Sequence, residues 1–371
     1  MRDDLRTVGV EEEFLLVGDD GTPVAVATEA LEKAPADVVT PVGDVPGGGL
    51  EHEFMQEQIE TGTRPCRDLE DLAREVRAGR ARVQHAAAAV GAHAVALATS
   101  PVDVAPTTVS KLRYMRAAST FGLTAAEQLT SGCHVHVSVT DDDEGVAVLD
   151  RIGPWLSPLL ALSANSPFWQ GKASGYESFR SQVWSRWPTA GPSREFGSAR
   201  AYRDAVASLV ATGTVLDDAM IYFDARLSQR YPTVEIRVAD VCLDPRTPVI
   251  LAALSRALVE TAARAAAAGE PAPGVPTELL RTASWRAGRS GLTGDLLSPT
   301  DMRPRPAHDV VGQLVAHVRD ALVDAGDLDL VTDLLGELWS TGNGAQRQRA
   351  WLAETGDNAE VVARACAVTL E

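Results

Sequence analysis

Residues 8–16 read VGVEEEFLL, and this stretch decides the fold because it predicts a β-strand whose two faces differ. Side chains alternate between the faces of a strand. The apolar side chains share one face with Glu12, whereas Glu11 and Glu13 point together to the other face. Two carboxylates side by side repel each other, so this arrangement requires a compensating cation. A solvated strand face would explain a single acidic run, but later segments repeat the pattern.

The composition describes an acidic chain that can bury a large core. Of its 371 residues, 45% are hydrophobic, and the formal net charge is −17. This charge argues against nucleic acid or an anionic membrane as the main partner. We expect a cytoplasmic protein, because no apolar run approaches the ~20 residues of a membrane helix and the N-terminus lacks a secretory signal's apolar stretch. The four cysteines have no CxxC spacing, so we expect reduced thiols.

The patterns place strands mainly in the first two-thirds of the chain and helices after them. We expect further strands or extended segments over 22–27, the second half of 51–63, 94–99, 132–140, 221–227 and 233–238. We expect helices over 28–33, 69–90, 111–121, 146–164, 199–212, 248–268 and 277–289, and mostly helix over 309–370 with a break at 342–344. Asp68 is the expected N-cap of the second helix, and Pro154 and Pro158 should kink or split the fourth. Residues 41–50 are expected to form a loop.

The strand predicted over 132–140, GCHVHVSVT, repeats the two-faced pattern with histidines. Its apolar side chains take one face, while His134 and His136 share the other with Ser138. Two imidazoles on one side of a strand are a common route to a metal site. Two such histidines by themselves are more often structural, and the acidic strands are what favour the metal interpretation.

Two further segments add charged residues to the same expected face. The strand over 233–238, TVEIRV, places Glu235 and Arg237 together, and the segment over 51–63 carries Glu53 and Glu60. Opposite charges two residues apart on a strand also occur as ordinary cross-strand pairs. Taken with the first strand and the histidines, these residues indicate one polar cavity.

Residues 165–198 form a long irregular stretch that contains the motif SFRSQVWSRWPTAGP. A segment of this length without regular structure is usually functional or disordered, and its tryptophans argue against disorder. Arg180 and Arg186 are therefore candidates to bind an anionic ligand. The alternative is that the tryptophans simply anchor a loop to the core.

The inward polar residues together predict a phosphoryl-transfer site that uses several metal ions. Five carboxylates in one cavity require neutralisation, and hard oxygen ligands in that number suit Mg²⁺ or Mn²⁺. A phosphorylated substrate would complete the metal shells, and an arginine would stabilise the transferring phosphoryl group. No GxxxxGK[ST] or GxGxxG motif occurs, so a nucleotide would be held by metals and arginines on an antiparallel sheet.

The chain also resembles a known family, the carboxylate–amine ligases of the glutamate–cysteine ligase type 2 group. The motifs VGVEEEF, QIETGTRPC, GCHVHVSV, SFRSQVWSRWPTAGP, TVEIRVAD, WRAGRSGL and TGNGAQRQRAWL carry the resemblance, in order, over nearly the whole chain. The resemblance implies an α+β fold of the glutamine-synthetase type: a mainly antiparallel, curved sheet of about six strands, covered by helices, in one domain over 1–371. It also implies a homodimer.

The resemblance implies an ATP-dependent ligase that joins glutamate to cysteine through an acyl phosphate, with Mg²⁺ or Mn²⁺. By position, the metal ligands would be Glu11, Glu13, Glu53, Glu60, His134 and Glu235. Arg237 would stabilise the phosphoryl group and contact the nucleotide together with Arg180 and Arg186, and His136 would support the metals or contact substrate. Three alternatives remain open: another acid or amine, a zinc hydrolase that uses the histidine pair, and a nucleotide- or amino-acid-binding protein without activity.

Overall fold

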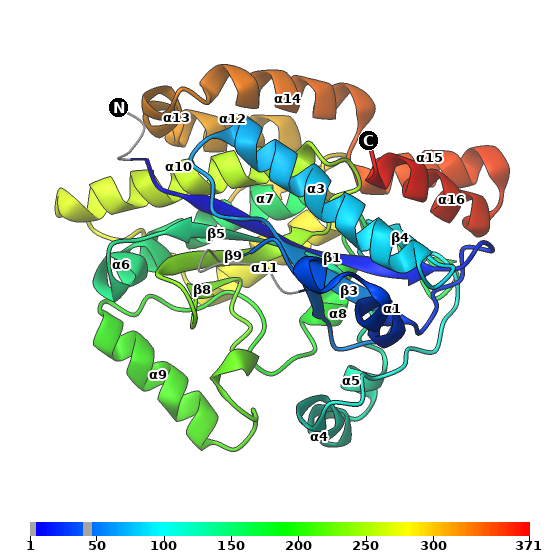
Figure 1. Cartoon of the computed structure of the whole chain (residues 1–371). Coiled ribbons are helices and arrows are strands. Elements are labelled where there is room, and N and C mark those ends of the chain that lie inside the picture. Colours follow the sequence, from blue (N-terminus) through cyan, green and yellow to red (C-terminus); the bar gives the residue numbers. More distant parts are fainter. Residues whose placement is uncertain (1–4, 40–46) are drawn as a thin grey trace.

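The computed structural model describes residues 5–39 and 47–371, and its centre is a seven-stranded sheet (Figure 1). The strand order is β2-β3-β1-β5-β9-β8, and β4 also pairs with β1; all pairings in this sheet are antiparallel. The strands are β1 Val8–Val17, β2 Leu50–His52, β3 Gln58–Gly62, β4 His93–Val95, β5 Gly132–Ser138, β8 Ala225–Leu227 and β9 Thr233–Asp240. The predicted α+β class with a mainly antiparallel sheet is confirmed.

The strand β1 is the organising element, because it pairs on both sides. Its residues Glu11 to Leu15 pair with β3, while the other edge pairs first with β5 and then with β4. The predicted strand over 22–27 is wrong: the return of the chain is reduced to one bridge between Val17 and Pro23, since proline has no N–H for a ladder. The strands predicted over 94–99 and 221–227 form but are shorter.

The helices follow the predicted ranges closely. In chain order they are α1 Ala27–Lys33, α2 Ala36–Val39, α3 Leu69–Ala88, α4 Leu112–Phe121, α5 Leu123–Ala126, α6 Asp142–Ile152, α7 Leu156–Ser163, α8 Arg180–Trp184, α9 Ala199–Ala211, α10 Thr247–Ala267, α11 Thr277–Ser290, α12 Ala307–His317, α13 Arg319–Ala325, α14 Leu328–Thr341, α15 Gly344–Thr355 and α16 Asn358–Thr369. Asp68 caps α3 as predicted, since its side chain accepts hydrogen bonds from the backbone N–H groups of Glu70 and Asp71. The loop predicted over 41–50 lies largely outside the described residues.

Helices α3, α7 and α10 pack against the apolar face of the sheet (Figure 1). That face contributes Val8 and Val10 of β1, with the valines of β5 and β9, to the largest core cluster. Glu12 lies on the same side and is buried against Arg80 of α3, whose guanidinium donates to both carboxylate oxygens at 2.6 and 3.2 Å. The middle carboxylate of the acidic run is therefore part of the core, and the opposite face of the sheet is left for the site.

One helical stretch, Asp142–Ser163, has the length and apolarity of a membrane span, which the sequence patterns did not predict. It comprises α6, a short 3-10 helix at Gly153–Trp155 and α7, so the predicted split near Pro154 is confirmed. Of its most apolar window, 83% is buried inside the fold, where it packs against α10 and α11. A core helix accounts for this composition.

The segment over 165–198 is ordered by short elements. It contains a small hairpin, β6 Phe168–Trp169 with β7 Lys172–Ala173, followed by α8. A second small hairpin, β10 Asp295–Leu297 with β11 Pro304–Pro306, lies further along the chain. Because α8 contacts β9, the tryptophan-rich motif is held beside the central strands.

Candidate active site

The polar faces of the central strands meet as the sequence predicted. In the antiparallel register, Glu11 of β1 lies opposite His134 of β5, and His136 of β5 lies opposite Glu235 of β9. Glu13 lies opposite Glu60 of β3. Side chains directly opposite each other stand on the same face of a sheet. Four strands from separate parts of the sequence thus place acidic and imidazole groups side by side.

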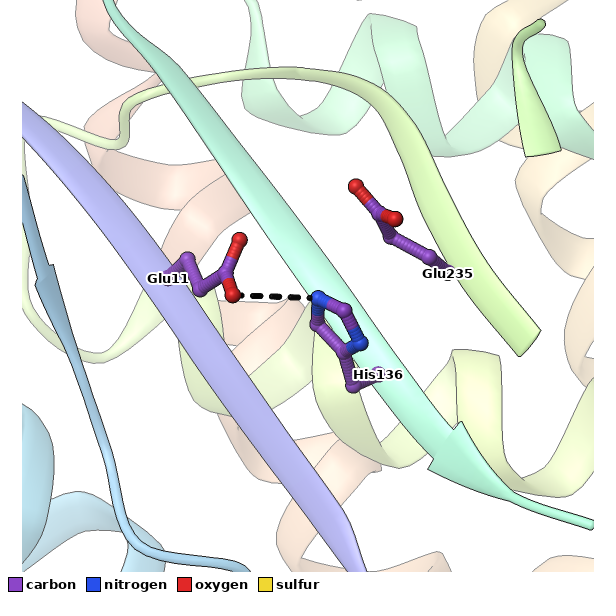
Figure 2. Close-up of side chains that lie close together, drawn as sticks. All are labelled: Glu11, His136 and Glu235. Carbon is purple, nitrogen blue, oxygen red and sulfur yellow. Dashed lines mark ion pairs between the residues drawn. The ribbon is translucent and has the colours of Figure 1, made fainter. Parts of the chain in front are cut away.

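The first cluster consists of Glu11, His136 and Glu235 (Figure 2). One ligand atom from each lies within 4.8 Å of the others, and His136 Nε2 is 3.3 Å from a Glu11 carboxylate oxygen. Burial alone would raise the pKa of Glu11, but the charges and hydrogen bonds of His136 and His134 together outweigh burial and lower that pKa well below its usual range. Burial would lower the pKa of the His136 imidazole, but the charge and hydrogen bond of Glu11, with the charge of Glu235, outweigh burial and raise that pKa.

The second cluster consists of Glu13, Glu53 and Glu60, whose ligand atoms also lie within 4.8 Å of one another. Burial and the charge of Glu53 raise the pKa of Glu13 to about 8. Burial, with a hydrogen bond from Glu53 and the neighbouring carboxylates, raises the pKa of Glu60 well above its usual range. Without a cation, Glu13 and Glu60 therefore hold protons at neutral pH, because neighbouring buried carboxylates disfavour each other's charge.

His134 lies between the two clusters. Its Nδ1 is 3.5 Å from Glu11, and its Nε2 is 3.7 Å from Glu13. Burial and the positive charge of Arg237 lower the pKa of His134 to about 4, so the imidazole is neutral at pH 7. The sequence predicted His134 as a ligand and His136 as a supporting residue. The geometry instead groups His136 with the carboxylates of one cluster and leaves His134 within reach of both.

Arg237 contacts one histidine and one carboxylate of the site. Its guanidinium contacts Glu235 and lies 3.5 Å from His134 Nδ1, and it stacks 5.9 Å from the ring centre of Trp184. The register between β5 and β9 shifts beside it: Val135 lies opposite Ile236, but Cys133 lies opposite Ala239. This bulge inserts one extra residue into β9. Bulges often change the direction in which nearby side chains point, and they are common next to active sites.

The bulge explains Asp240, which the sequence patterns did not single out. Strict alternation from Glu235 would turn Asp240 toward the apolar face, but the shifted register places it opposite Gly132 on the site face. Asp240 is completely buried and accepts hydrogen bonds from the backbone of Asn165 and from the hydroxyls of Ser166 and Ser178. It therefore ties the tryptophan-rich segment to the end of β9.

Two arginines predicted to bind a nucleotide lie in different surroundings. Arg180 is 2% exposed and 3.9 Å from Asp240, and its charge acts to lower the pKa of Glu13 against burial. Arg186 pairs with Glu127 at 2.5 Å and does not contribute to the cavity lining. Neither Arg180 nor Arg186 lines the cavity, so nucleotide binding by these two arginines stays a prediction; Arg180 lies close enough for its charge to act on a carboxylate of the second cluster.

Both clusters open into one cavity of about 520 Å³. Its wall carries the two acidic clusters with His134, Arg237 and Arg226, the last of which the sequence patterns also missed. Arg226 of β8 lies opposite Glu235 of β9. The alternation of polar residues along the strand predicted over 221–227 could therefore have identified Arg226 as a residue of the site face. The lining also contains a group of aromatic side chains in contact with one another: Phe54, Tyr114, Trp184, Trp187 and Tyr222.

The donor set fits hard divalent cations. Each cluster supplies carboxylate oxygens, with an imidazole in the first, and such ligands suit Mg²⁺ or Mn²⁺. Among residues 5–39 and 47–371, the buried Nε2 atoms of His134 and His136 have no hydrogen-bond partner. Raised carboxylate pKa values, as in the second cluster, and imidazole nitrogens that lie near carboxylates without a hydrogen bond are both expected where a cation completes the site.

Comparison with known proteins agrees with this geometry. The model of a family described as glutamate-cysteine ligase family 2 matches residues 7–367. The chain belongs to this family. It is 51% identical to "Putative glutamate–cysteine ligase 2-1" of Streptomyces avermitilis, covering 96% of this chain and 98% of that protein. It is 52% identical to "Putative glutamate–cysteine ligase 2" of Streptomyces coelicolor, covering 97% and 98%.

Solved structures of ligases share the fold. A glutamate–cysteine ligase of Francisella tularensis, solved in complex with AMP, superimposes with a TM-score of 0.68 at 14% identity, over 99% of this chain and 89% of that one. A bifunctional glutathione synthetase of Pasteurella multocida gives a TM-score of 0.69 at 16% identity, over 98% of this chain and 52% of that one. The expected ligase-type catalytic sheet is confirmed, and the family makes this chain an ATP-using carboxylate–amine ligase.

Proposed function

We propose that this family member joins glutamate to cysteine through an acyl phosphate. In the first step, a carboxylate oxygen of glutamate attacks the γ-phosphorus of ATP, and ADP leaves. In the second step, the cysteine amine attacks the acyl carbon, phosphate leaves, and the amine gives up a proton. The observation that carries the proposal is the pair of acidic clusters beside Arg237 in one cavity large enough for substrates.

The roles of the residues follow from their positions. Glu11, His136 and Glu235 would hold one divalent cation, and Glu13, Glu53 and Glu60 a second, with His134 in reach of both. Bound Mg²⁺ or Mn²⁺ would offset the charge of the carboxylates and of the ATP phosphates.

Arg237 would stabilise the negative charge on the transferred phosphoryl group, because its guanidinium faces the cavity beside both clusters. The positive charge of Arg180 would favour the ionised form of Glu13 in the second cluster. We include in the proposal a single catalytic domain and a homodimer, which rest on the family resemblance, and a cytoplasmic location, which rests on the sequence patterns.

The decisive experiment is a measurement of ADP release with ATP and Mg²⁺. Glutamate alone, glutamate with cysteine, and glutamate with a panel of other amines are compared, and each product is identified by mass. We expect release to require both glutamate and cysteine. Dependence on a different amine would keep the ligase chemistry and replace cysteine.

A matched pair of variants makes the assay specific to the site. E235Q removes a carboxylate of the first cluster and should reduce ADP release at least a hundredfold, whereas E29Q changes an exposed glutamate of α1 and should leave it unchanged. The proposal would be contradicted if the wild-type protein released no ADP with glutamate and any of the amines tested, or if it catalysed a hydrolysis that needs no nucleotide.

A further inference from the structure

Arg226 makes the most extensive contact with a cluster carboxylate. It lies directly opposite Glu235 in the pairing of β8 with β9. Its Nε donates to one carboxylate oxygen of Glu235 at 2.8 Å, and its Nη2 donates to the other at 3.3 Å. A planar guanidinium that meets both oxygens fixes the plane of the carboxylate, which a single point charge does not do.

The guanidinium of Arg226 is itself held from a second direction. Its Nη1 donates to the backbone carbonyl of Ile221 at 2.8 Å and reaches that of Ala219 at 3.4 Å. The same loop is tied to α4, because Asp217 pairs with Arg113 through two contacts of 2.9 Å. The Arg226 side chain is 15% exposed, so its fork has little freedom to rotate away from Glu235.

Glu235 has a second arginine partner with a different task. Arg237 contacts the oxygen of Glu235 that also receives Nη2 of Arg226. The buried Nε of Arg237 has no hydrogen-bond partner within residues 5–39 and 47–371, and the Arg237 side chain lines the cavity. Without Arg226, the contact from Arg237 would remain on one oxygen of Glu235 and would not by itself fix the plane of the carboxylate.

We propose that Arg226 is a positioning residue that holds the Glu235 carboxylate facing Glu11 and His136. This inference rests on the proposed function, in which the first cluster binds a divalent cation. Groups that orient a metal ligand in this way typically change metal affinity ten- to a hundredfold when they are replaced.

The test is a titration of the protein with Mn²⁺, in which binding is measured as the decrease of the free Mn²⁺ signal in electron paramagnetic resonance. R226K keeps the positive charge but loses the planar pair of N–H donors that contacts both oxygens of Glu235. We expect this substitution to weaken Mn²⁺ binding by about tenfold or more. R203K is the matched control, since Arg203 forms an exposed ion pair with Asp142 on the surface. Unchanged Mn²⁺ affinity in a folded R226K protein would overturn the inference.

A rescue experiment covers the case in which R226K does not fold. R226A leaves a space that added guanidinium can fill, and guanidinium should restore Mn²⁺ affinity whereas methylammonium, which has charge without a fork, should not. Equal rescue by both cations, or none, would contradict a positioning role. The titration needs no substrate, so it tests the metal site separately from the ligase activity. A wild-type protein that binds no Mn²⁺ would contradict the proposed metal site itself. Equal binding by wild type and R226K would contradict only the role of Arg226.

Discussion

Neighbouring carboxylates on β1 should respond in opposite directions to the same isosteric change. E12Q removes the charge that balances Arg80, and E13Q removes a carboxylate from the second cluster. The two residues are adjacent in sequence but face opposite sides of the sheet. We expect E12Q to destabilise the metal-free protein and E13Q to stabilise it.

The cost of E12Q follows from the burial of its partner. The Glu12 and Arg80 side chains are 3% and 1% exposed, and the other Arg80 donors are used by the carbonyls of Cys242, Leu243 and Thr369. The guanidinium has no route to water and stays charged. Breaking a buried pair by removing one partner typically costs about 3–5 kcal/mol, and we expect a loss in this range.

The gain from E13Q follows from the raised pKa of Glu13. Its folded-state pKa is about 8 against an ordinary 4.5. At pH 7 the unfolded chain carries the charge while the folded chain holds the proton, a penalty of up to about 3 kcal/mol at 1.36 kcal/mol per pKa unit. Glutamine avoids this penalty and can still accept the 2.6 Å hydrogen bond from Gly132 N–H. We expect a gain of about 1–3 kcal/mol at pH 7.

The assay is urea unfolding of wild type, E12Q and E13Q in EDTA, monitored by tryptophan fluorescence at several pH values. Because the Glu13 pKa is raised, the folded state loses stability as pH rises from about 4.5 to about 8, so the advantage of E13Q should shrink toward pH 5 and grow toward pH 8. Shifts of the same sign for both variants, or an advantage of E13Q that does not depend on pH, would refute the reasoning.

Three further outcomes are expected. E144Q should lower the free energy of unfolding by about 1 kcal/mol at pH 7, after allowance for the exposure of the pair, because hydrogen bonding to Arg6 lowers the Glu144 pKa to about 2. This loss should fade as the pH drops from about 4.5 toward 2. An equal loss at pH 3 in chemical unfolding would contradict the prediction. G344A should destabilise by about 1–3 kcal/mol, since a methyl group at Gly344 would overlap the buried side chain of Asn165, and an unchanged melting temperature would exclude that contact. Mg²⁺ with ATP at a hundred times its dissociation constant should stabilise the protein by about 2.7 kcal/mol, and EDTA should reverse the shift in calorimetry.

The sequence by itself determined which residues form the central strands and which face of each is polar. Alternation along a strand depends only on local backbone geometry, so Glu11 and Glu13, the two histidines of β5, and Glu235 with Arg237 could be assigned to one face from their spacing. The N-cap at Asp68 was predictable for the same reason, because its hydrogen bonds reach only two and three residues along the chain. The motifs, in order, also indicated the family.

The tertiary structure decided how these residues are combined. The sequence left Glu12 on the apolar face without a partner, and only the packing of α3 supplied Arg80. The bulge in β9 turned Asp240 toward the site, and the strand register brought Arg226 onto Glu235 and grouped His136 with Glu11. Register, bulges and helix packing are set by contacts between distant segments, and single-strand periodicity carries no information about them.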